Sequence, residues 1–378
     1  MELLPTYDVA IIGGGLAGLA ASILMRRKGY SVILFEKETY PFHRVCGEYV
    51  SLESKGFLKS LGLPLDDWML PHVDTLQLTA PNGKLFAAAL PLGGFGISRY
   101  KLDHELAVIA RQAGVHLLEG TKVEAVERGE GFKVSFRRQA ISATLCFASY
   151  GKRSNLDVKW NRGFLHRQNN RLNNFVGVKY HIRSSWPKNV IGLHNFENGY
   201  CGISRIEDEI YCLCYMTRAE NLKRSGNSIT AMQEAVLFQN PHLKRIFKTS
   251  EVLQEFPVTI SQISFSQKPK VENGVLMLGD SAGMITPLCG NGMSIALHTA
   301  KIASTLGAQF LHGELTQSNL EKTYQEQWNK HFASRLRTGR LLQSFFGSKG
   351  LSNFFVSTFL RAPFLAGPVI RQTHGEPF

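Results

Sequence analysis

The amino-acid sequence predicts an α/β fold, in which a doubly wound parallel sheet carries an inserted antiparallel sheet and a helical C-terminal part. A strand, a glycine-rich turn, a helix and a second strand open the chain. Short strands separated by turn residues follow in the middle, and long helical stretches occupy the last third. The chain has 378 residues, more than one ordinary domain, so we expect two units that share a large core.

The N-terminal unit is a β-α-β arrangement, which opens a parallel sheet. Residues 8–12 form an apolar, β-branched strand, and residues 16–28 carry small and apolar residues at helical spacing. Gly29 closes this helix. Residues 31–35 form a second buried strand, which ends at Glu36.

Later segments predict further elements. Residues 75–87 alternate around the turn Pro81-Asn82-Gly83 and predict a hairpin, and residues 190–217 predict antiparallel strands with turns at 198–199 and 207–209. Helical patterns cover residues 102–113, 229–239, 293–311 and 320–346. From these elements we expect a discontinuous Rossmann-like domain (1–70, 98–155 and 271–345), an inserted substrate domain (71–97 and 156–270) and a C-terminal cap (346–378).

Composition is typical of a soluble globular protein, with 44% hydrophobic and 19% charged residues. No window approaches the ~18 to 20 continuous apolar residues of a spanning helix, and no basic and apolar leader precedes the first strand. The cysteines lack a C-x-x-C pair and zinc-like spacing, so we expect free thiols, no metal site and a cytoplasmic location. The six cysteines are Cys46, Cys146, Cys201, Cys212, Cys214 and Cys289.

The formal net charge of +13 is concentrated in residues 152–188 and beyond residue 320. Such stretches suit phosphates or an acidic membrane surface, and a solvated basic face explains them equally well. No nucleic-acid-binding motif accompanies the charge, so nucleic acid is not an expected partner.

The glycine-rich turn at residues 13–18, Gly-Gly-Gly-Leu-Ala-Gly, predicts a phosphate site. Gly13 permits the tight turn, Gly15 lets a pyrophosphate approach, and Gly18 lets the helix pack on the strand, while the helix N-terminus faces the anion. Glu36 ends the second strand, where a carboxylate can accept both ribose hydroxyls of an adenosine and would repel a 2′-phosphate. The site therefore suits FAD or NAD.

Residues 275–296 favour FAD over NAD. An apolar strand leads to Gly279 and Asp280, and a loop then leads through Gly290-Asn291-Gly292 into a helix at Met293. The acid can bind a ribityl hydroxyl, while amides at the helix N-terminus can stabilise negative charge at the flavin N1/C2 carbonyl.

With these ordered motifs, the sequence resembles the para-hydroxybenzoate hydroxylase superfamily of FAD proteins, and within it the geranylgeranyl reductase-like branch, over about residues 6–340. The resemblance implies that Gly279 and Asp280 bind the riboflavin part of FAD. It also implies that Arg99 lies along the FAD and that the backbone of Val123, in the strand that follows, contacts the adenine. A surface arginine at a helix start is the alternative for Arg99.

The segment Arg44-Val45-Cys46-Gly47-Glu48 points to the reductase branch, whose members resemble it in carrying a Cys-Gly pair near the flavin ring. Cys46 is therefore the predicted catalytic residue, a thiol that donates a proton to an alkene or shapes the pocket; ordinary packing is the alternative. Glu48, Tyr200 and Cys201 are predicted to line the substrate pocket, with a sheet-core position as the alternative for the last two. The residues predicted to bind FAD are Gly13, Gly15, Leu16, Ala17, Gly18, Glu36, Lys37, Arg44, Cys46, Gly47, Arg99, Val123, Gly279, Asp280, Gly290, Gly292 and Met293.

The sequence departs from these relatives at two places. Many hydroxylases of the superfamily carry an Asp-Gly pair after a mid-chain strand, thought to touch FAD and the nicotinamide donor, and here Tyr150 stands in place of the acid. The change puts conventional docking of NADH or NADPH in doubt, although Lys152 and Arg153 could hold a phosphate.

The Trp-x-Trp-x-x-Pro box expected of flavin halogenases is missing. Cys212 and Cys214 share one strand face and are interpreted as core.

The expected function is that of an FAD-dependent oxidoreductase acting on an apolar small molecule: an isoprenoid, a polyketide or an aromatic compound. Double-bond reduction and hydroxylation through a C4a-hydroperoxyflavin both stay open, with NADH or NADPH as external reductant. The alternative is a non-catalytic or electron-carrying flavoprotein with a protein partner, although the inserted sheet argues for a substrate chamber. The phenylalanine-rich tail, residues 345–378, suits a cap, an interfacial segment or packing onto the body. Peripheral contact with a membrane or a carrier protein is therefore open.

Overall fold

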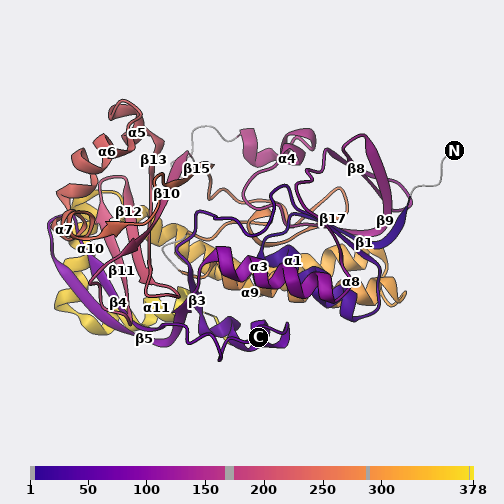
Figure 1. Ribbon diagram of the computed structural model, residues 1–378, viewed down its shortest axis with the longest axis horizontal. Helices are drawn as coiled ribbons and strands as arrows, with labels where there is room; N and C mark the ends of the chain where they lie inside the picture. The colour runs from indigo at the N-terminus through magenta and orange to yellow at the C-terminus, as the bar shows by residue number, and fades with distance from the viewer. Residues whose placement is uncertain (1–4, 167–173, 287–289, 374) are drawn as a thin grey trace.

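The computed structural model describes residues 5–166, 174–286, 290–373 and 375–378. Two sheets lie side by side along the long axis of the molecule, as Figure 1 shows, with the first sheet at the right and the second at the left. The C-terminus lies below the middle of the molecule in this view.

The first sheet has the order β16-β17-β9-β1-β2-β6, and the strands β7 and β8 extend from β9. The central strand β1 pairs in parallel with β2 and β9, so the predicted β-α-β unit is present. Its residues from Val9 to Ile12 are buried, as expected of a parallel strand covered on both faces. The strands are β1 (Thr6–Ile12), β2 (Val32–Phe35), β6 (His116–Leu118), β7 (Ala125–Arg128), β8 (Phe132–Phe136), β9 (Gln139–Ala148), β16 (Val271–Glu272) and β17 (Val275–Met277).

Long helices pack with this sheet around one apolar core. The helix α1 (Leu16–Arg27) contacts both α3 (Arg99–Gln112) and α8 (Gly292–Leu311), and α8 contacts α9 (Gln317–Phe345). Gly29, at a φ of 93°, follows the end of α1 in the left-handed region that glycine adopts readily. Leu19, Leu297 and Trp328 are buried in the shared core.

The second sheet has the order β14-β10-β13-β12-β11-β4-β5-β3, and β15 pairs with β10. The hairpin of β4 and β5 is confirmed, with Thr79 opposite Leu85. The predicted antiparallel sheet contains one parallel pair, β4 with β11, because no short turn joins these distant strands. The strands are β3 (Tyr49–Ser51), β4 (His72–Thr79), β5 (Leu85–Gly96), β10 (Phe175–Arg183), β11 (Val190–Phe196), β12 (Gly199–Arg205), β13 (Tyr211–Arg218), β14 (Glu251–Val252) and β15 (Val258–Ile263).

Different layers cover the two faces of the second sheet. The helices α5 (Ala219–Arg224), α6 (Ile229–Ala235) and α7 (Pro241–Thr249) close one apolar cluster, in which Met232 and Leu243 are buried. The tail helices α10 (Lys349–Arg361) and α11 (Ala366–Thr373) contribute to a second cluster with residues of β4, β5 and β12. Two short helices, α2 (Lys55–Ser60) and α4 (Asn155–Lys159), complete the described helices of the chain.

Among the described residues, no single helix is long and apolar enough to span a membrane. Only α10 together with residues 363–372, bent by 110° relative to it, has the length and composition of a span as a pair.

Candidate active site

The glycine turn connects β1 to α1 and leaves one side open. A side chain at Gly13 would lie 2.6 Å from the backbone of Tyr150, and one at Gly18 would fall on the carbonyl oxygen of Gly13. At Gly15 the nearest atom to an added Cβ is Arg99 Nη2, at 3.9 Å. Gly15 is the N-cap of α1 without a side-chain cap, so the helix N-terminus keeps amide donors for an anion. This arrangement fits a pyrophosphate.

Glu36 lies beside the turn and is 3% exposed. Its Oε2 accepts hydrogen bonds from Gly14 N at 2.9 Å and from Arg44 Nη2 at 3.0 Å, and its Oε1 accepts from Glu38 N at 3.0 Å. A carboxylate offers about four acceptor positions, of which three are in use. Acceptance of both ribose hydroxyls therefore requires one donor to leave, and the Arg44 side chain is the donor that can move.

Asp103 joins two of the predicted cofactor residues, although the sequence reasoning did not single it out. Its buried carboxylate accepts from Arg44 Nε at 3.0 Å and from Arg99 Nε and Nη2 at 2.8 and 2.7 Å. This pairing raises the pKa of Arg99 although burial opposes it. The available signal was the spacing of Arg99 and Asp103, four residues apart on α3.

The second predicted cofactor segment converges on the same place. Gly279 has a φ of 57° and directly precedes the half-buried Asp280. Burial raises the pKa of Asp280, while the charges of Lys268, Arg99 and Lys152 oppose that rise. A Cβ built at Gly279 would lie 3.6 Å from the Cβ of Ala17, so residues 279–280 lie beside the start of α1 and the glycine turn. The loop residues 287–289, with Cys289, lie outside the described residues, as do residues 167–173 of the basic stretch.

The buried Lys268 and the half-buried Lys270 hold the loops around Asp280 together, a feature that the sequence did not reveal. Lys268 Nζ donates to the carbonyl oxygens of Lys152 at 2.6 Å and of Asp280 at 2.9 Å, and Lys270 Nζ donates to that of Ala282 at 2.7 Å. Burial lowers the pKa of Lys268 to about 8 and that of Lys270 to about 7.

Tyr150, the residue in place of the usual acid, belongs to a buried polar group. Its hydroxyl donates to Asp157 Oδ1 at 2.6 Å and accepts from Arg162 Nη1 at 3.2 Å. The guanidinium of Arg162 also donates to the carbonyl oxygens of Ser281 and Pro269, both at 3.1 Å. Arg162 therefore ties together the loops on either side of Asp280, and Tyr150 helps to hold Arg162 in place.

Residues 46–48 lie between this site and the second sheet. Cys46 is half-buried, its Sγ accepts from Glu48 N at 3.5 Å, and its carbonyl oxygen accepts from Cys212 Sγ at 3.2 Å. The carbonyl oxygen of the exposed Gly47 accepts from Ser204 Oγ at 3.2 Å. Burial raises the pKa of the Cys46 thiol, although the Arg99 charge opposes it. The thiol therefore keeps its proton near neutral pH.

Glu48 is fully buried and gathers charged partners from both units. Its Oε1 accepts from Arg99 N at 2.9 Å and from Lys179 Nζ at 2.7 Å, and its Oε2 is 2.7 Å from His181 Nε2. Burial by itself would raise the pKa of Glu48, but His181 and Lys179 outweigh it and lower the pKa to about 2. Sequence reasoning missed Lys179 and His181; their alternation on β10 is the signal that places them on one face.

Tyr200 and Cys201 face opposite sides of β12. Tyr200 packs with the tail, its ring 6.4 Å from that of Phe346, whereas Cys201 is buried in the cluster closed by α5–α7. They therefore cannot line the same cavity. Cys212 and Cys214 share the face of Lys179. Cys212 is buried, as expected of a core residue, and contacts the carbonyl oxygen of Cys46, whereas Cys214 is half-buried.

The remaining predicted cofactor residues differ in exposure. The side chains of Leu16, Ala17 and Met293 are buried, and Lys37 is exposed and pairs with Glu38 at 3.3 Å. Val123 is buried but precedes β7 instead of lying in a strand. A side chain at Gly290 would lie 3.1 Å from the Tyr49 ring, and Gly292 begins α8.

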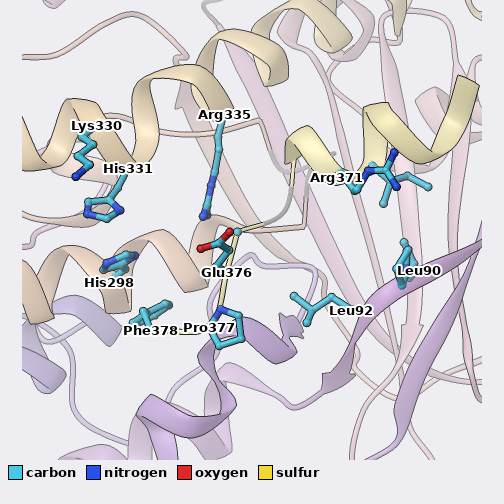
Figure 2. Close-up of a pocket in the computed structure, with 13 residues that line it drawn as sticks. Leu90, Leu92, His298, Lys330, His331, Arg335, Arg371, Glu376, Pro377 and Phe378 are labelled. Atoms are coloured by element: carbon cyan, nitrogen blue, oxygen red, sulfur yellow. The ribbon is translucent and has the colours of Figure 1, made fainter.

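A separate cavity of about 680 Å³ lies between α8, α9, α11 and the C-terminal residues (Figure 2). His298, Lys330, Arg335 and Arg371 line it together with apolar residues such as Leu90. None of its lining residues belongs to the predicted site, so the converging polar groups above, and not this cavity, define the candidate site. Within the described ranges, no cluster of three or more His, Cys, Asp or Glu could hold a metal ion, and the cysteines that the structure describes there are free.

The chain is similar to known proteins in both sequence and fold. The profile of the NAD(P)-binding Rossmann-like domain family matches residues 11–48, and that of squalene epoxidase matches residues 202–339. The chain is 25% identical to conditioned medium factor receptor 1 of Dictyostelium discoideum, covering 86% of this chain and 68% of that protein. It is 22% identical to digeranylgeranylglycerophospholipid reductase 2 of Methanopyrus kandleri, covering 88% and 84%.

Two solved structures share the whole fold. The flavin-dependent brominase Bmp2 superposes with a TM-score of 0.78 at 20% identity, covering 97% of this chain and 93% of the brominase. A geranylgeranyl bacteriochlorophyll reductase-like protein of Thermoplasma acidophilum gives a TM-score of 0.77 at 19% identity, covering 93% and 91%. The chain is therefore an FAD-dependent oxidoreductase that is similar in sequence to a digeranylgeranylglycerophospholipid reductase and in fold to a geranylgeranyl reductase-like protein and a flavin-dependent brominase.

Proposed function

We propose that this flavoprotein reduces a carbon–carbon double bond of an apolar small molecule, with Cys46 as the proton donor. The observation that carries the proposal is the Cys46 thiol, which is half-buried beside Arg99. Burial raises the pKa of this thiol. A thiol that keeps its proton suits an acid better than a nucleophile, which needs the thiolate. FAD, when bound, supplies the hydride chemistry.

The proposed FAD site uses three groups of residues. Gly13, Gly15 and Gly18, with the backbone of Leu16 and Ala17, hold the pyrophosphate, and Glu36 holds the adenosine ribose after Arg44 leaves it. Arg99, Asp280 and the start of α8 hold the isoalloxazine half. Contacts from the remaining predicted residues, Lys37, Gly47, Val123, Gly279, Gly290, Gly292 and Met293, complete the proposal.

The proposed substrate is apolar and lies between Cys46 and the sheet face of Tyr200. One relative is named a digeranylgeranylglycerophospholipid reductase, and one structural neighbour is a flavin-dependent brominase. In this chain, Tyr200, Met216 and Phe346 belong to one apolar cluster on that face. We extend the proposal to the division of the chain: residues 1–70, 98–155 and 271–345 bind FAD, residues 71–97 and 156–270 bind substrate, and residues 346–378 cap the site.

The proposed reductant is NADH or NADPH. Tyr150 is held by Asp157 and Arg162 and is not an acid, so a nicotinamide donor needs other contacts. Lys152, whose pKa burial and Arg153 lower to about 8, is a candidate phosphate contact, because an approaching phosphate favours its charged form.

The deciding experiment follows the flavin through one catalytic cycle. The purified protein is loaded with FAD, reduced anaerobically with NADH or NADPH, and mixed with geranylgeraniol or with oxygen. Reoxidation by the alkene supports the reductase. A transient absorbance band after oxygen, with an oxygenated product, supports hydroxylation instead, and reoxidation only by a protein acceptor supports an electron carrier.

Variants connect this experiment to the thiol. We expect Cys46→Ala to slow reoxidation by the alkene by about a hundredfold, the typical contribution of a positioned acid, and to leave reduction by NADH or NADPH unchanged. Cys214→Ala is the matched control, a half-buried thiol on β13. Equal rates for the two variants would remove Cys46 from the mechanism.

We also infer that the tail rests on an acidic membrane surface. Phe354 and Phe364 are 68% and 77% exposed, and the exposed Arg361 lies between them in the sequence. Exposed aromatic side chains beside basic ones are typical of interfacial binding. Vesicles with phosphatidylglycerol should sediment the wild-type chain and the Phe256→Ser control, which alters a residue 73% exposed elsewhere, but not Phe354→Ser/Phe364→Ser. Equal sedimentation of all three would contradict the inference.

A further inference from the structure

Glu48 stands at the centre of a buried group of charged and titratable side chains. It has a φ of 55°, and its carboxylate meets Lys179 Nζ and His181 Nε2, both at 2.7 Å. Left-handed backbone costs free energy at a residue other than glycine. A buried ion pair contributes little net stability compared with apolar residues of the same size. Both costs point to a role beyond folding.

The outer end of the group reaches solvent. The ring of His181 lies 5.2 Å from that of His43, in an edge-on arrangement, and His43 is exposed and stacks on Tyr100 at 4.7 Å. His43 and His181 therefore form a pair of imidazoles that leads from the surface to the Glu48 carboxylate. Imidazole is the side chain whose ordinary pKa lets it take up and release protons near neutral pH.

The inner end of the group reaches Cys46. Glu48 N donates to Cys46 Sγ at 3.5 Å, so the carboxylate and the thiol belong to residues only two positions apart. Lys179 and the Cys46 thiol each act on the pKa of the other by their charges. The other charged or titratable groups that face this cluster are Arg99 on α3 and Cys212 and Cys214 on β13.

We propose that Glu48, Lys179 and His181 form a buried acid–base site that controls the proton on the Cys46 thiol and refills it from solvent through His43. The proposal rests on the role of Cys46 given above. In one turnover the alkene receives a hydride and the Cys46 proton, which leaves a thiolate. Lys179 gives its proton to that thiolate, and one solvent proton, passed from His43 through His181 and Glu48, restores Lys179. Lys179, Glu48, His181 and His43 are positioning and transfer residues, since only Cys46 touches the substrate.

Thiol alkylation tests the proposal in the resting protein, without flavin or substrate. The rate at which iodoacetamide modifies Cys46 is followed against pH by mass spectrometry of the peptide. Glu48→Gln removes a negative charge and should lower the pH midpoint of alkylation by about one unit, which makes alkylation about tenfold faster at a fixed pH below the midpoint. Lys179→Met removes a positive charge and should raise the midpoint by about as much. Lys179→Arg keeps the charge and should keep the profile.

Glu53→Gln is the matched control, because Glu53 is also a buried glutamate, paired with Arg335 at 3.4 Å. Its alkylation profile should equal that of the wild type. Midpoints for Glu48→Gln and Lys179→Met that both coincide with the wild type, in chains with native circular dichroism, would overturn the acid–base site. Failure of alkene reduction would overturn the proposed function and leave this result unaffected.

A measurement on the wild-type chain covers the case in which the variants do not fold. The imidazole signals of His181 and His43 are followed by nuclear magnetic resonance against pH, before and after iodoacetamide blocks Cys46. A coupled site requires that the block shift the titration of His181. Identical titration curves before and after the block would contradict the proposal.

Discussion

Glu36 and Glu48 are both buried glutamates, yet their surroundings give them different tasks. Glu36 accepts from two backbone amides and one arginine, and its position at the end of β2 leaves the Arg44 contact exchangeable. Glu48 meets a lysine and a histidine and is fully buried, so its charge is fixed by partners from the other unit. One side chain therefore suits recognition, and the other suits proton control.

Replacement of Glu36 by alanine tests the ribose contact. We expect Glu36→Ala to weaken FAD binding by about 1.5 to 3 kcal/mol, because hydrogen bonds to a charged group are lost. Glu38→Ala, which changes an exposed neighbour whose backbone amide still bonds residue 36, should bind FAD normally. Titration of the flavin fluorescence measures both affinities, and equal affinities would mean that the ribose contact is misassigned.

The acid stability of the chain should depend on Glu48. Its pKa is lowered from an ordinary value of 4.5 to about 2 in the folded state, so its stabilising contribution is present above pH 4.5 and is lost as the pH falls toward 2. We expect Glu48→Gln to cost about 3 to 5 kcal/mol at neutral pH, since it leaves Lys179 buried without its carboxylate. The variant should also lose less stability between pH 5 and about 2.

Urea unfolding at several pH values measures this difference. Asp66→Asn is a useful control, because Lys59 and Lys55 lower the pKa of Asp66 to about 2 as well, but the group is exposed and screened by solvent. Its stability should follow the wild-type curve closely in moderate salt. A Glu48→Gln curve parallel to the wild-type curve would contradict the assignment.

The turn between β1 and α1 shows how an element sets the geometry of the site. Backbone atoms crowd Gly13 and Gly18, whereas Gly15 has open space on the side of Arg99. The same spacing of glycines therefore serves two purposes, close packing at its ends and access in its middle. The approach of Gly279 to Ala17 at the start of α1 adds the second half of the site.

Gly18→Ala tests this turn. The added methyl would fall on the Gly13 carbonyl oxygen, which cannot move without breaking the turn, so a cost of about 1 to 3 kcal/mol and loss of bound flavin are expected. Gly56→Ala, at an exposed helical position with no atom within 4 Å, should retain FAD and gain up to about 1 kcal/mol. The flavin-to-protein ratio and the thermal midpoint report both effects; retained flavin in Gly18→Ala would argue against the predicted pyrophosphate position.

Over the whole molecule, the tail helices cover one of the two faces of the second sheet. The helix α10 divides its phenylalanines between two environments: Phe359 is 7% exposed and packs on Phe86 and Phe355, whereas Phe354 is 68% exposed. The expected packing onto the body and an exposed apolar surface therefore coexist on one helix.

Because Phe359 is buried and Phe354 is exposed, we expect their substitution to have different effects. Phe359→Ala should cost about 3 to 5 kcal/mol through the cavity that it leaves, and it should release the tail to proteases. Phe354→Ala should change stability by less than about 0.5 kcal/mol. Urea unfolding and limited proteolysis compare the variants, and equal behaviour would mean that α10 does not dock as described.

The sequence by itself determined the strand, turn, helix and second strand at residues 8–35, the hairpin at 75–87, and FAD as the cofactor, because hydrophobic periodicity and glycine spacing are local signals. It also placed Cys46 and Arg99 among the candidate residues. It did not reveal Asp103, Lys179, His181 or Lys268, because each acquires its role from a partner distant in the chain. Only the tertiary structure decided that β10 of the second sheet places Lys179 and His181 against Glu48, and that Tyr200 and Cys201 face apart. Contacts between distant strands depend on how the two sheets meet, and no local pattern encodes that arrangement.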